Sequence, residues 1–218
     1  MMLARRLRQA LVPAVLLAAA PLVSATLYKE AITYNSQVRW SSSVFPAKVI
    51  SKECFRHPQH GYVMTRVVIE CIEVGVKGDL GDTVGKRTTF NLLGGTKDGV
   101  TTAVADSPFL AVGDRAVFFL QKTQEGTIFL PFLGHSVVRI EQDATTGQDM
   151  VEVNWPVTTY GKATVGDLEK NARITRKSLA SFLEDVKEVV RLEEERAKEK
   201  AELERRLQEQ QQKDDSGR

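Results

Sequence analysis

The sequence predicts a mainly β protein: a small barrel or sandwich of about seven strands, followed by a long C-terminal α-helix. Three observations predict this fold. Short apolar segments recur roughly every 10–20 residues between about residues 44 and 157, with no helical pattern between them. Turn residues separate these segments. After about residue 164, apolar residues follow the three- and four-residue spacing of an amphipathic helix.

Residues 1–25 have the organisation of a cleavable secretory signal. Three arginines between residues 5 and 8 form a basic start, and an apolar stretch covers residues 10–22. Cleavage is predicted between Ala25 and Thr26. The apolar stretch is shorter than the about 20 residues that a membrane-spanning helix needs. We therefore expect a periplasmic or secreted protein with no stable membrane insertion after cleavage.

The formal net charge of +2 comes from this leading segment. The 218 residues include 30 Lys and Arg and 28 Asp and Glu, and residues 1–25 hold three arginines and no acidic residue. The remaining chain thus has 27 basic and 28 acidic residues and a net charge of −1. Such a balance provides no overall basic field, so we expect no nucleic-acid partner. The sequence also lacks a Gly-x-Ser-x-Gly nucleophile elbow and a phosphate-binding loop, and we expect neither a cofactor nor an enzyme.

We assign residues 26–165 to the β domain, and its clearest predicted strand covers residues 62–74. Apolar residues occupy alternate positions there from Val63 to Cys71. Residues 116–120 are apolar throughout, which is typical of a strand buried on both faces. The other predicted strands are residues 44–50, 88–93, 127–130, 137–140 and 150–153.

The C-terminal helix is predicted over residues 166–212, with Thr175 or Ser178 as candidate caps. An apolar stripe extends from Leu179 to Val190, and we expect it to pack on the β domain or on a partner.

After Leu192 the predicted helix is mostly charged, with Glu and Lys or Arg at favourable i,i+4 spacing. Leu203 and Leu207 would face the same side. Two interpretations stay open: a solvated helix, or a helix that binds a partner or forms a coiled coil. Two leucines alone do not sustain the heptads that a coiled coil needs. Residues 213–218 are predicted to be a disordered tail.

Cys54 and Cys71 are the only cysteines, and they are candidates for a disulfide. An oxidising compartment favours a bridge. Hairpin geometry opposes it, since Cys54 would lie near a turn at residues 57–61 and Cys71 far along the returning strand. As an alternative, Cys71 fills a core position as a small apolar residue. Both possibilities stay open at this point.

A metal site is a second candidate, because Cys54, His57 and His60 lie close together in sequence. Spacings of two residues between ligands are common at metal sites. Histidines in a polar turn are also common on unliganded surfaces. The alternative function is therefore a metal-binding protein or a metal-dependent enzyme built on these residues. Trp40 and Trp155 are interpreted as core or rim anchors.

The β region resembles known groups of exported proteins. The pattern from Val63 through residues 73–78, with a Lys-Gly step, is followed by residues 90–95 and by Pro108–Arg115. This order resembles uncharacterised exported bacterial proteins and the OB-type barrel of netrin-like modules and tissue inhibitors of metalloproteinases. The resemblance implies an OB-like fold. Those inhibitors use an N-terminal cysteine to bind the protease zinc, and no cysteine lies near Thr26, so that mechanism does not carry over.

Together these observations predict an exported, non-enzymatic protein-interaction module. Its partner is an unknown protein, for which the resemblance suggests an exported protease.

Overall fold

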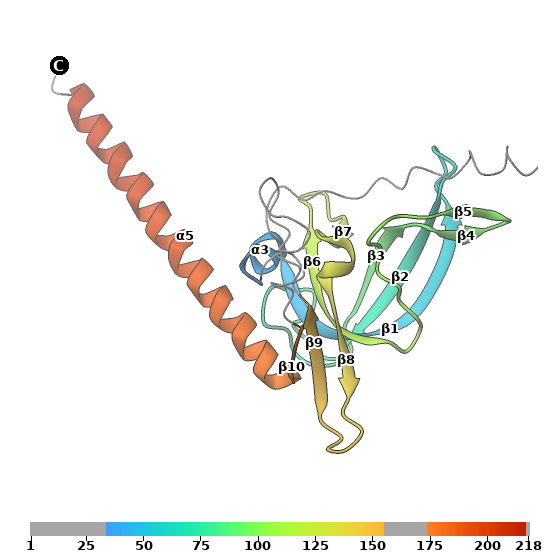
Figure 1. The fold of residues 1–218 in the computed structure, drawn as a ribbon. Coiled ribbons are helices and arrows are strands. Elements are labelled where there is room, and N and C mark those ends of the chain that lie inside the picture. The colour runs from blue at the N-terminus through green and yellow to red at the C-terminus, as the bar shows by residue number, and fades with distance from the viewer. Residues whose placement is uncertain (1–33, 155–173, 217–218) are drawn as a thin grey trace, which may run out of the picture.

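The computed structural model describes residues 34–154 and 174–216, so the predicted cleavage site at Ala25 and Thr26 lies outside the described residues. Figure 1 shows a β domain and one long helix that leaves it. In chain order the elements are α3 (Tyr34–Trp40), β1 (Ser43–Arg56), β2 (Val63–Cys71), β3 (Arg87–Leu93), β4 (Gly95–Lys97), β5 (Val100–Thr102), β6 (Arg115–Lys122), β7 (Ile128–Phe129), the 3-10 turn η1 (Leu133–Ser136), β8 (Val137–Gln142), β9 (Asp149–Asn154), β10 (Ile174–Ser178) and α5 (Leu179–Ser216).

Eight of the ten described strands form one antiparallel sheet. Its order is β10-β9-β8-β6-β1-β2-β3, with β7 paired to β6, while β4 and β5 form a separate hairpin. β1 is the longest strand, and its first part pairs with β6 and its later part with β2. The strand order does not return from β3 to β10, so the described sheet is open and the predicted barrel is not confirmed. The mainly β fold with a C-terminal helix is confirmed.

A first apolar core lies on one face of β6, β1, β2 and β3 and takes side chains from all four strands. Phe45, Phe90 and Phe118 are its largest members. Leucines from three connecting segments complete it: Leu80, Leu110 and Leu130.

A second core lies on the opposite face, where β1, β6, β8 and β9 meet α3 and α5. β6 contributes to both cores. Ala116, Phe118 and Leu120 point into the first core, and Val117 and Phe119 into the second. This alternation confirms the prediction that residues 116–120 are buried on both faces.

The base of α5 is an integral part of the second core. Leu179, Phe182, Leu183, Val186 and Val190 are all buried there. The apolar stripe thus packs on the β domain, which decides between the two alternatives that the sequence left open.

The structure differs from the predicted helix boundaries at both ends. Residues 174–178 form β10, which pairs with β9, and the helix begins at Leu179. Ser178 is the cap, since its Oγ accepts the backbone N–H of Ser181 at 3.2 Å. At the other end α5 continues to Ser216, into the predicted tail, because extending an existing helix costs little.

Beyond Val190, α5 projects from the domain (Figure 1). Residues 191–216 extend about 39 Å at 1.5 Å per residue. Ion pairs within the helix cover much of its surface, for example Arg191 with Glu195 at 2.6 Å and Arg206 with Glu202 at 2.5 Å. Such solvent-exposed pairs stabilise a helix only slightly. None of the described helices is both long and apolar enough to cross a membrane.

Candidate functional site

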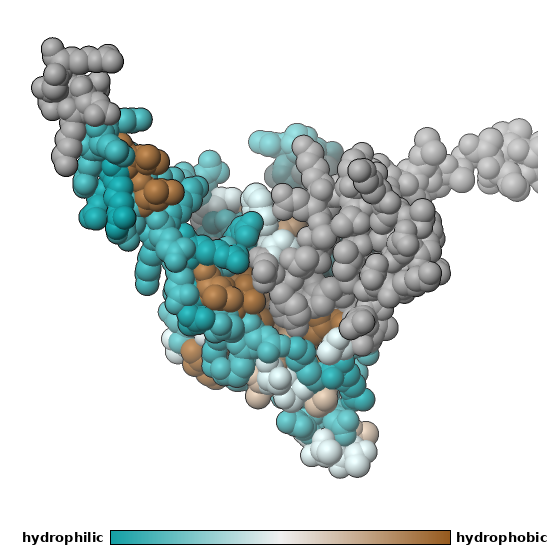
Figure 2. Space-filling view, turned by 60° about the vertical axis from the view of Figure 1, so that its left-hand side comes forward, coloured by the Kyte–Doolittle hydropathy of each residue, from teal (hydrophilic) through white to brown (hydrophobic). Residues whose placement is uncertain are grey.

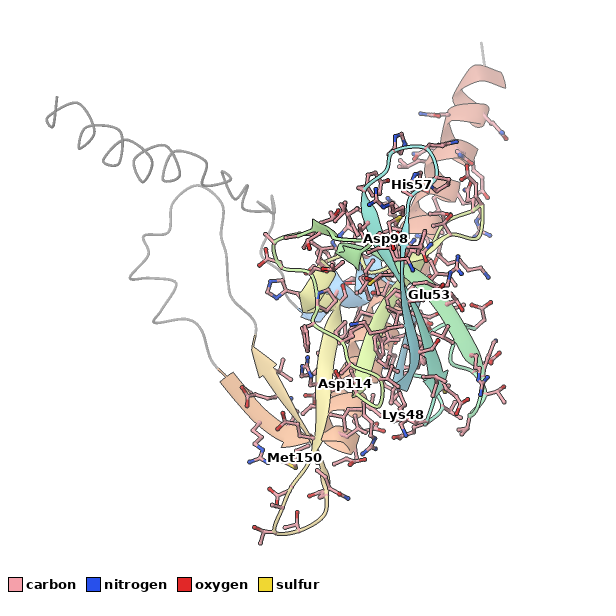
Figure 3. All side chains as sticks on the ribbon, turned by 90° about the vertical axis from the view of Figure 1, so that its right-hand side faces the viewer. Lys48, Glu53, His57, Asp98, Asp114 and Met150 are labelled. Carbon is pink, nitrogen blue, oxygen red and sulfur yellow. The ribbon has the colours of Figure 1, made fainter. Side chains whose placement is uncertain are left out.

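The predicted metal residues do not converge. His57, His60 and Tyr62 form a ring cluster at the tip of the β1–β2 hairpin, with His57 4.8 Å from each of the other two ring centroids. The Nδ1 atom of His57 accepts the backbone N–H of Gln59 at 3.3 Å. Within the described parts of the chain, no three His, Cys, Asp or Glu side chains are placed to hold a metal ion. Figure 3 shows His57 near Asp98 at this end of the sheet.

Cys54 has a different set of neighbours. Its Sγ lies 3.4 Å from Oγ1 of Thr65, and this hydroxyl donates to the carbonyl oxygen of Gly94 at 2.7 Å. Because the Thr65 proton is used there, the thiol is the donor to Thr65. The side chain of Cys54 is therefore engaged on β2 rather than directed at the two histidines.

The register excludes a disulfide between the two cysteines. Cys54 is opposite Thr65, and Cys71 is opposite Ala47, so the two lie about 20 Å apart along the strands. Both thiols are free. Cys71 is buried in the first core and donates to the carbonyl oxygen of Glu73 at 3.1 Å. Burial raises the pKa of its thiol, as expected for a thiol that fills a core position.

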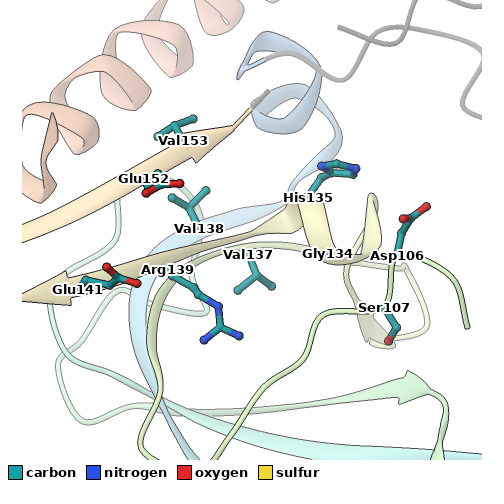
Figure 4. A pocket seen from close by; sticks show the side chains of 10 residues that line it. All are labelled: Asp106, Ser107, Gly134, His135, Val137, Val138, Arg139, Glu141, Glu152 and Val153. Carbon is teal, nitrogen blue, oxygen red and sulfur yellow. The ribbon is translucent and has the colours of Figure 1, made fainter. Parts of the chain in front are cut away.

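A groove of about 440 Å³, lined by both polar and apolar side chains, lies between η1, residues 106–107 and the strands β8 and β9. Figure 4 shows His135 and Asp106 at one end and Arg139 and Glu141 toward the other. Arg139 is held in place by the carboxylate of Asp114 at 3.3 Å and by the carbonyl oxygen of Phe109. The groove offers charges of both signs and one imidazole to a polar ligand.

The groove does not assemble a nucleophile and a base from its labelled side chains. Ser107 points away from the His135 ring (Figure 4). Burial lowers the pKa of His135, and the nearby carboxylate of Asp106 opposes this effect. The imidazole is thus kept neutral near neutral pH.

One ion pair joins the β domain's central strand to the β8–β9 hairpin. The guanidinium of Arg115 binds Asp149 through two contacts of 2.8 and 2.5 Å. The hydrogen bond from Arg115 lowers the pKa of Asp149. This pair fixes the hairpin that forms one side of the groove.

Comparison with known proteins found no matching family model, no matching curated protein and no matching solved structure.

Sequence patterns did not identify the features that are most unusual in the structure. Phe109 is 80% exposed and Trp40 is 58% exposed, although both residue types favour burial. Trp40 is therefore a surface residue rather than a core anchor, while Trp155 lies outside the described residues. No sequence signal separates exposed Phe109 from buried Leu110, because both lie in one apolar stretch next to a turn.

Proposed function

We propose that this chain is an exported, non-enzymatic protein-interaction module, and that the projecting part of α5 is the element that binds another protein. The observation that carries the proposal is the division of α5 into two parts. Its base is built into the second core, whereas the part after Val190 projects from the domain (Figure 1), and Glu193 at the start of this part forms an ion pair with Arg39 of α3.

The direction of the projecting part is set at its base. Arg39 of α3 forms an ion pair with Glu193 at 3.2 Å. Lys77 donates to the carbonyl oxygen of Val38 at 2.6 Å and so also holds α3. A binding helix that is held in one orientation loses little conformational entropy when a partner binds, and this favours a role in recognition.

Two leucines mark the binding face. Leu203 is 59% exposed and Leu207 is 51% exposed, and they lie one turn apart on a projecting segment that is otherwise mostly charged or polar. Figure 2 shows an apolar patch on the hydrophilic distal part of α5. An i,i+4 pair of apolar anchors is how an amphipathic helix enters a groove of a partner. The ion pair between Glu202 and Arg206 lies beside these leucines and supplies polar contacts at the rim.

The resemblance to metalloproteinase inhibitors makes an exported protease the first partner class to test. Inhibition through an N-terminal cysteine is not part of the proposal, since the chain has none near Thr26.

Site-specific photo-crosslinking in the native host tests the proposal. A photoreactive residue at position 203 or 207 should give one shared crosslinked protein, identified by mass spectrometry. Arg205 lies on the opposite side of the helix and is the matched control position. The Leu203→Asp and Leu207→Asp double variant should lose the adduct formed from a further position on the same face, such as 210. Equal crosslinking at 203, 205 and 207, or none at any of them, would contradict a binding face on α5.

A further inference from the structure

One face of the sheet formed by β1, β2 and β3 has no core packed on it. Val67 and Ile69 of β2 point into the first core, whereas Met64, Arg66 and Val68 at the alternate positions are not buried. Neither of the two cores formed by the described residues takes side chains from this side of β2. This side of the three strands is therefore open to a ligand.

Near the tip of the β1–β2 hairpin, this open side carries aromatic and apolar side chains. Phe55 of β1 lies opposite Met64 of β2, and Met64 lies opposite Leu93 of β3, so the three form one row across the strands. Closer to the tip, the N–H of His57 donates to the carbonyl oxygen of Tyr62 at 2.8 Å. His57 follows Phe55 by two residues and Tyr62 precedes Met64 by two, so strand alternation puts all of them on one face.

His60 completes the aromatic group. Its ring centre lies 4.8 Å from that of His57 and 5.6 Å from that of Tyr62, and its side chain is exposed. Figure 3 shows His57 at this end of the sheet, with Glu53 further along β1. We call this surface the tip face, and it consists of Phe55, His57, His60, Tyr62, Met64 and Leu93.

A row of hydrogen-bonding side chains borders the tip face. Two residues further from the tip, Glu53 lies opposite Arg66 and Arg66 lies opposite Asn91, and all three are exposed. A carboxylate, a guanidinium and an amide each offer two adjacent polar atoms, which match two neighbouring hydroxyl groups of a ligand. The Arg66 guanidinium also lies 5.1 Å from the centre of the Phe55 ring, so the polar row adjoins the aromatic surface directly.

The arginines beside the tip face already have carboxylate partners. Arg66 pairs with Glu53 at 3.7 Å, and Arg56 pairs with Asp98 at 3.9 Å. A nucleic acid is bound by cations that replace the counterions of its phosphates. Because both arginines are paired, they are poorly suited to that task, and the tip face favours an uncharged ligand.

The size of the tip face argues against a folded protein as its ligand. Three strands and two rows of residues span about 10 Å by 7 Å of backbone. A specific protein interface buries about 800 Å² on each partner, far more than this surface offers. A sugar ring has a small footprint, with C–H groups on its faces and hydroxyl groups around its edge. Its C–H groups carry slight positive charge and pack favourably on the negative face of an aromatic ring.

We propose that the tip face binds an uncharged glycan chain. The aromatic side chains lie against the faces of the sugar rings, and the row of Glu53, Arg66 and Asn91 bonds their hydroxyl groups. A β-1,4-linked chain is extended and ribbon-like, so it can lie along this surface, whereas an α-1,4-linked glucose chain coils away from it. This site is separate from the binding face proposed on α5, and neither depends on the other.

An NMR titration of the purified chain tests this proposal, with its N-terminal residue established by mass spectrometry. Cellohexaose and chitohexaose are the β-1,4-linked probes, and at least one should shift the amide resonances of residues 53–66 and 91–93 with a Kd of about 1 mM or tighter. Maltohexaose, the α-1,4-linked control, should bind at least about tenfold more weakly. An oligothymidylate should leave these resonances unchanged.

Variants locate the binding. Tyr62→Ala should weaken it at least about tenfold. Phe109→Ala is the matched control, because it removes an aromatic ring that is 80% exposed and lies outside the tip face. Circular dichroism checks that each variant is folded, and His60→Ala replaces Tyr62→Ala if the latter is not.

Three results would overturn the proposal: no shift of these resonances with either probe at about 10 mM, equal weakening by the tip-face variant and Phe109→Ala, or a response to the oligothymidylate alone. The Leu203→Asp and Leu207→Asp double variant should bind the glycan normally, which separates this surface from the one proposed on α5.

Discussion

Truncation of Phe182 to alanine should reveal how much of the fold depends on the base of α5. Phe182 is fully buried in the second core, together with Val117 and Phe119 of β6 and Val38 of α3. The side chain therefore lies where α5, the sheet and the short α3 helix meet, and among the described side chains of α5 none is both as large and as completely buried.

The expected loss is about 4 kcal/mol. Phe→Ala changes in cores cost about 3–5 kcal/mol, because the transfer free energy of the ring is lost and a cavity remains. On one side Phe182 packs against strands of the sheet. These strands cannot move into the cavity left by the ring without breaking the backbone hydrogen bonds between them. A domain of this size has a total stability of about 5–15 kcal/mol, so the variant should lose a large fraction of it.

Urea unfolding followed by far-UV circular dichroism measures this loss. The midpoint should fall sharply while the slope of the transition stays the same. Leu203→Ala is the control, since Leu203 is 59% exposed, and its effect should stay within about 0.5 kcal/mol. A loss below about 1 kcal/mol for Phe182→Ala would refute the packing of α5 on the sheet.

Three further predictions concern the β domain. Alkylation of the native protein should modify Cys54 but not Cys71, which is 1% exposed. Because both thiols are free, reduction should leave the mass of the protein unchanged. Mass spectrometry with and without denaturant checks both results. Burial lowers the pKa of His135, so the imidazole binds a proton at higher pH in the unfolded chain than in the folded one. The stability of the folded protein should therefore decrease below about pH 6.5. Thermal denaturation at several pH values checks this, and His135→Gln should make the stability depend less on pH. In Gly81→Ala the new Cβ would lie 2.1 Å from the phenylalanine ring of β1, and the loss should reach about 3 kcal/mol by urea denaturation. Gly99→Ala meets nothing within 4 Å at a φ of +74°, so only backbone strain of about 1 kcal/mol is expected, and equal losses for the two variants would contradict the packing described.

The sequence predicted the strands wherever side chains alternate or are apolar throughout. Each of the seven predicted segments overlaps an observed strand. β4 and β5 were missed because each has three residues and depends on pairing with the other. β10 was missed because Thr175, Arg176 and Lys177 show no apolar alternation, and its register with β9 defines it as a strand.

The exposed apolar residues of the structure were harder to predict from the sequence than its strands. A sequence shows that Phe109 and Leu110 are both apolar, but which of the two enters the core depends on the hydrogen bonds of the turn with Asp114 and Val49. The same limit applied to Cys54 and His57. Their closeness in sequence suggested a common site, whereas the pairing of Cys54 with Thr65 directs its thiol elsewhere.

The arrangement of β6 explains why the helix belongs to the fold and also extends beyond it. A strand with apolar side chains on both faces needs a packed layer on each. Phe90 of β3, whose ring lies 6.0 Å from that of Phe118, and leucines of the connecting segments pack over Phe118, while α3 and the base of α5 provide the layer over Val117 and Phe119. The sheet and the first three turns of α5 should therefore unfold together. Because that base is fixed, the following 26 residues leave the domain in a set direction, and Leu203 and Leu207 are presented in a defined orientation rather than on a loose tail.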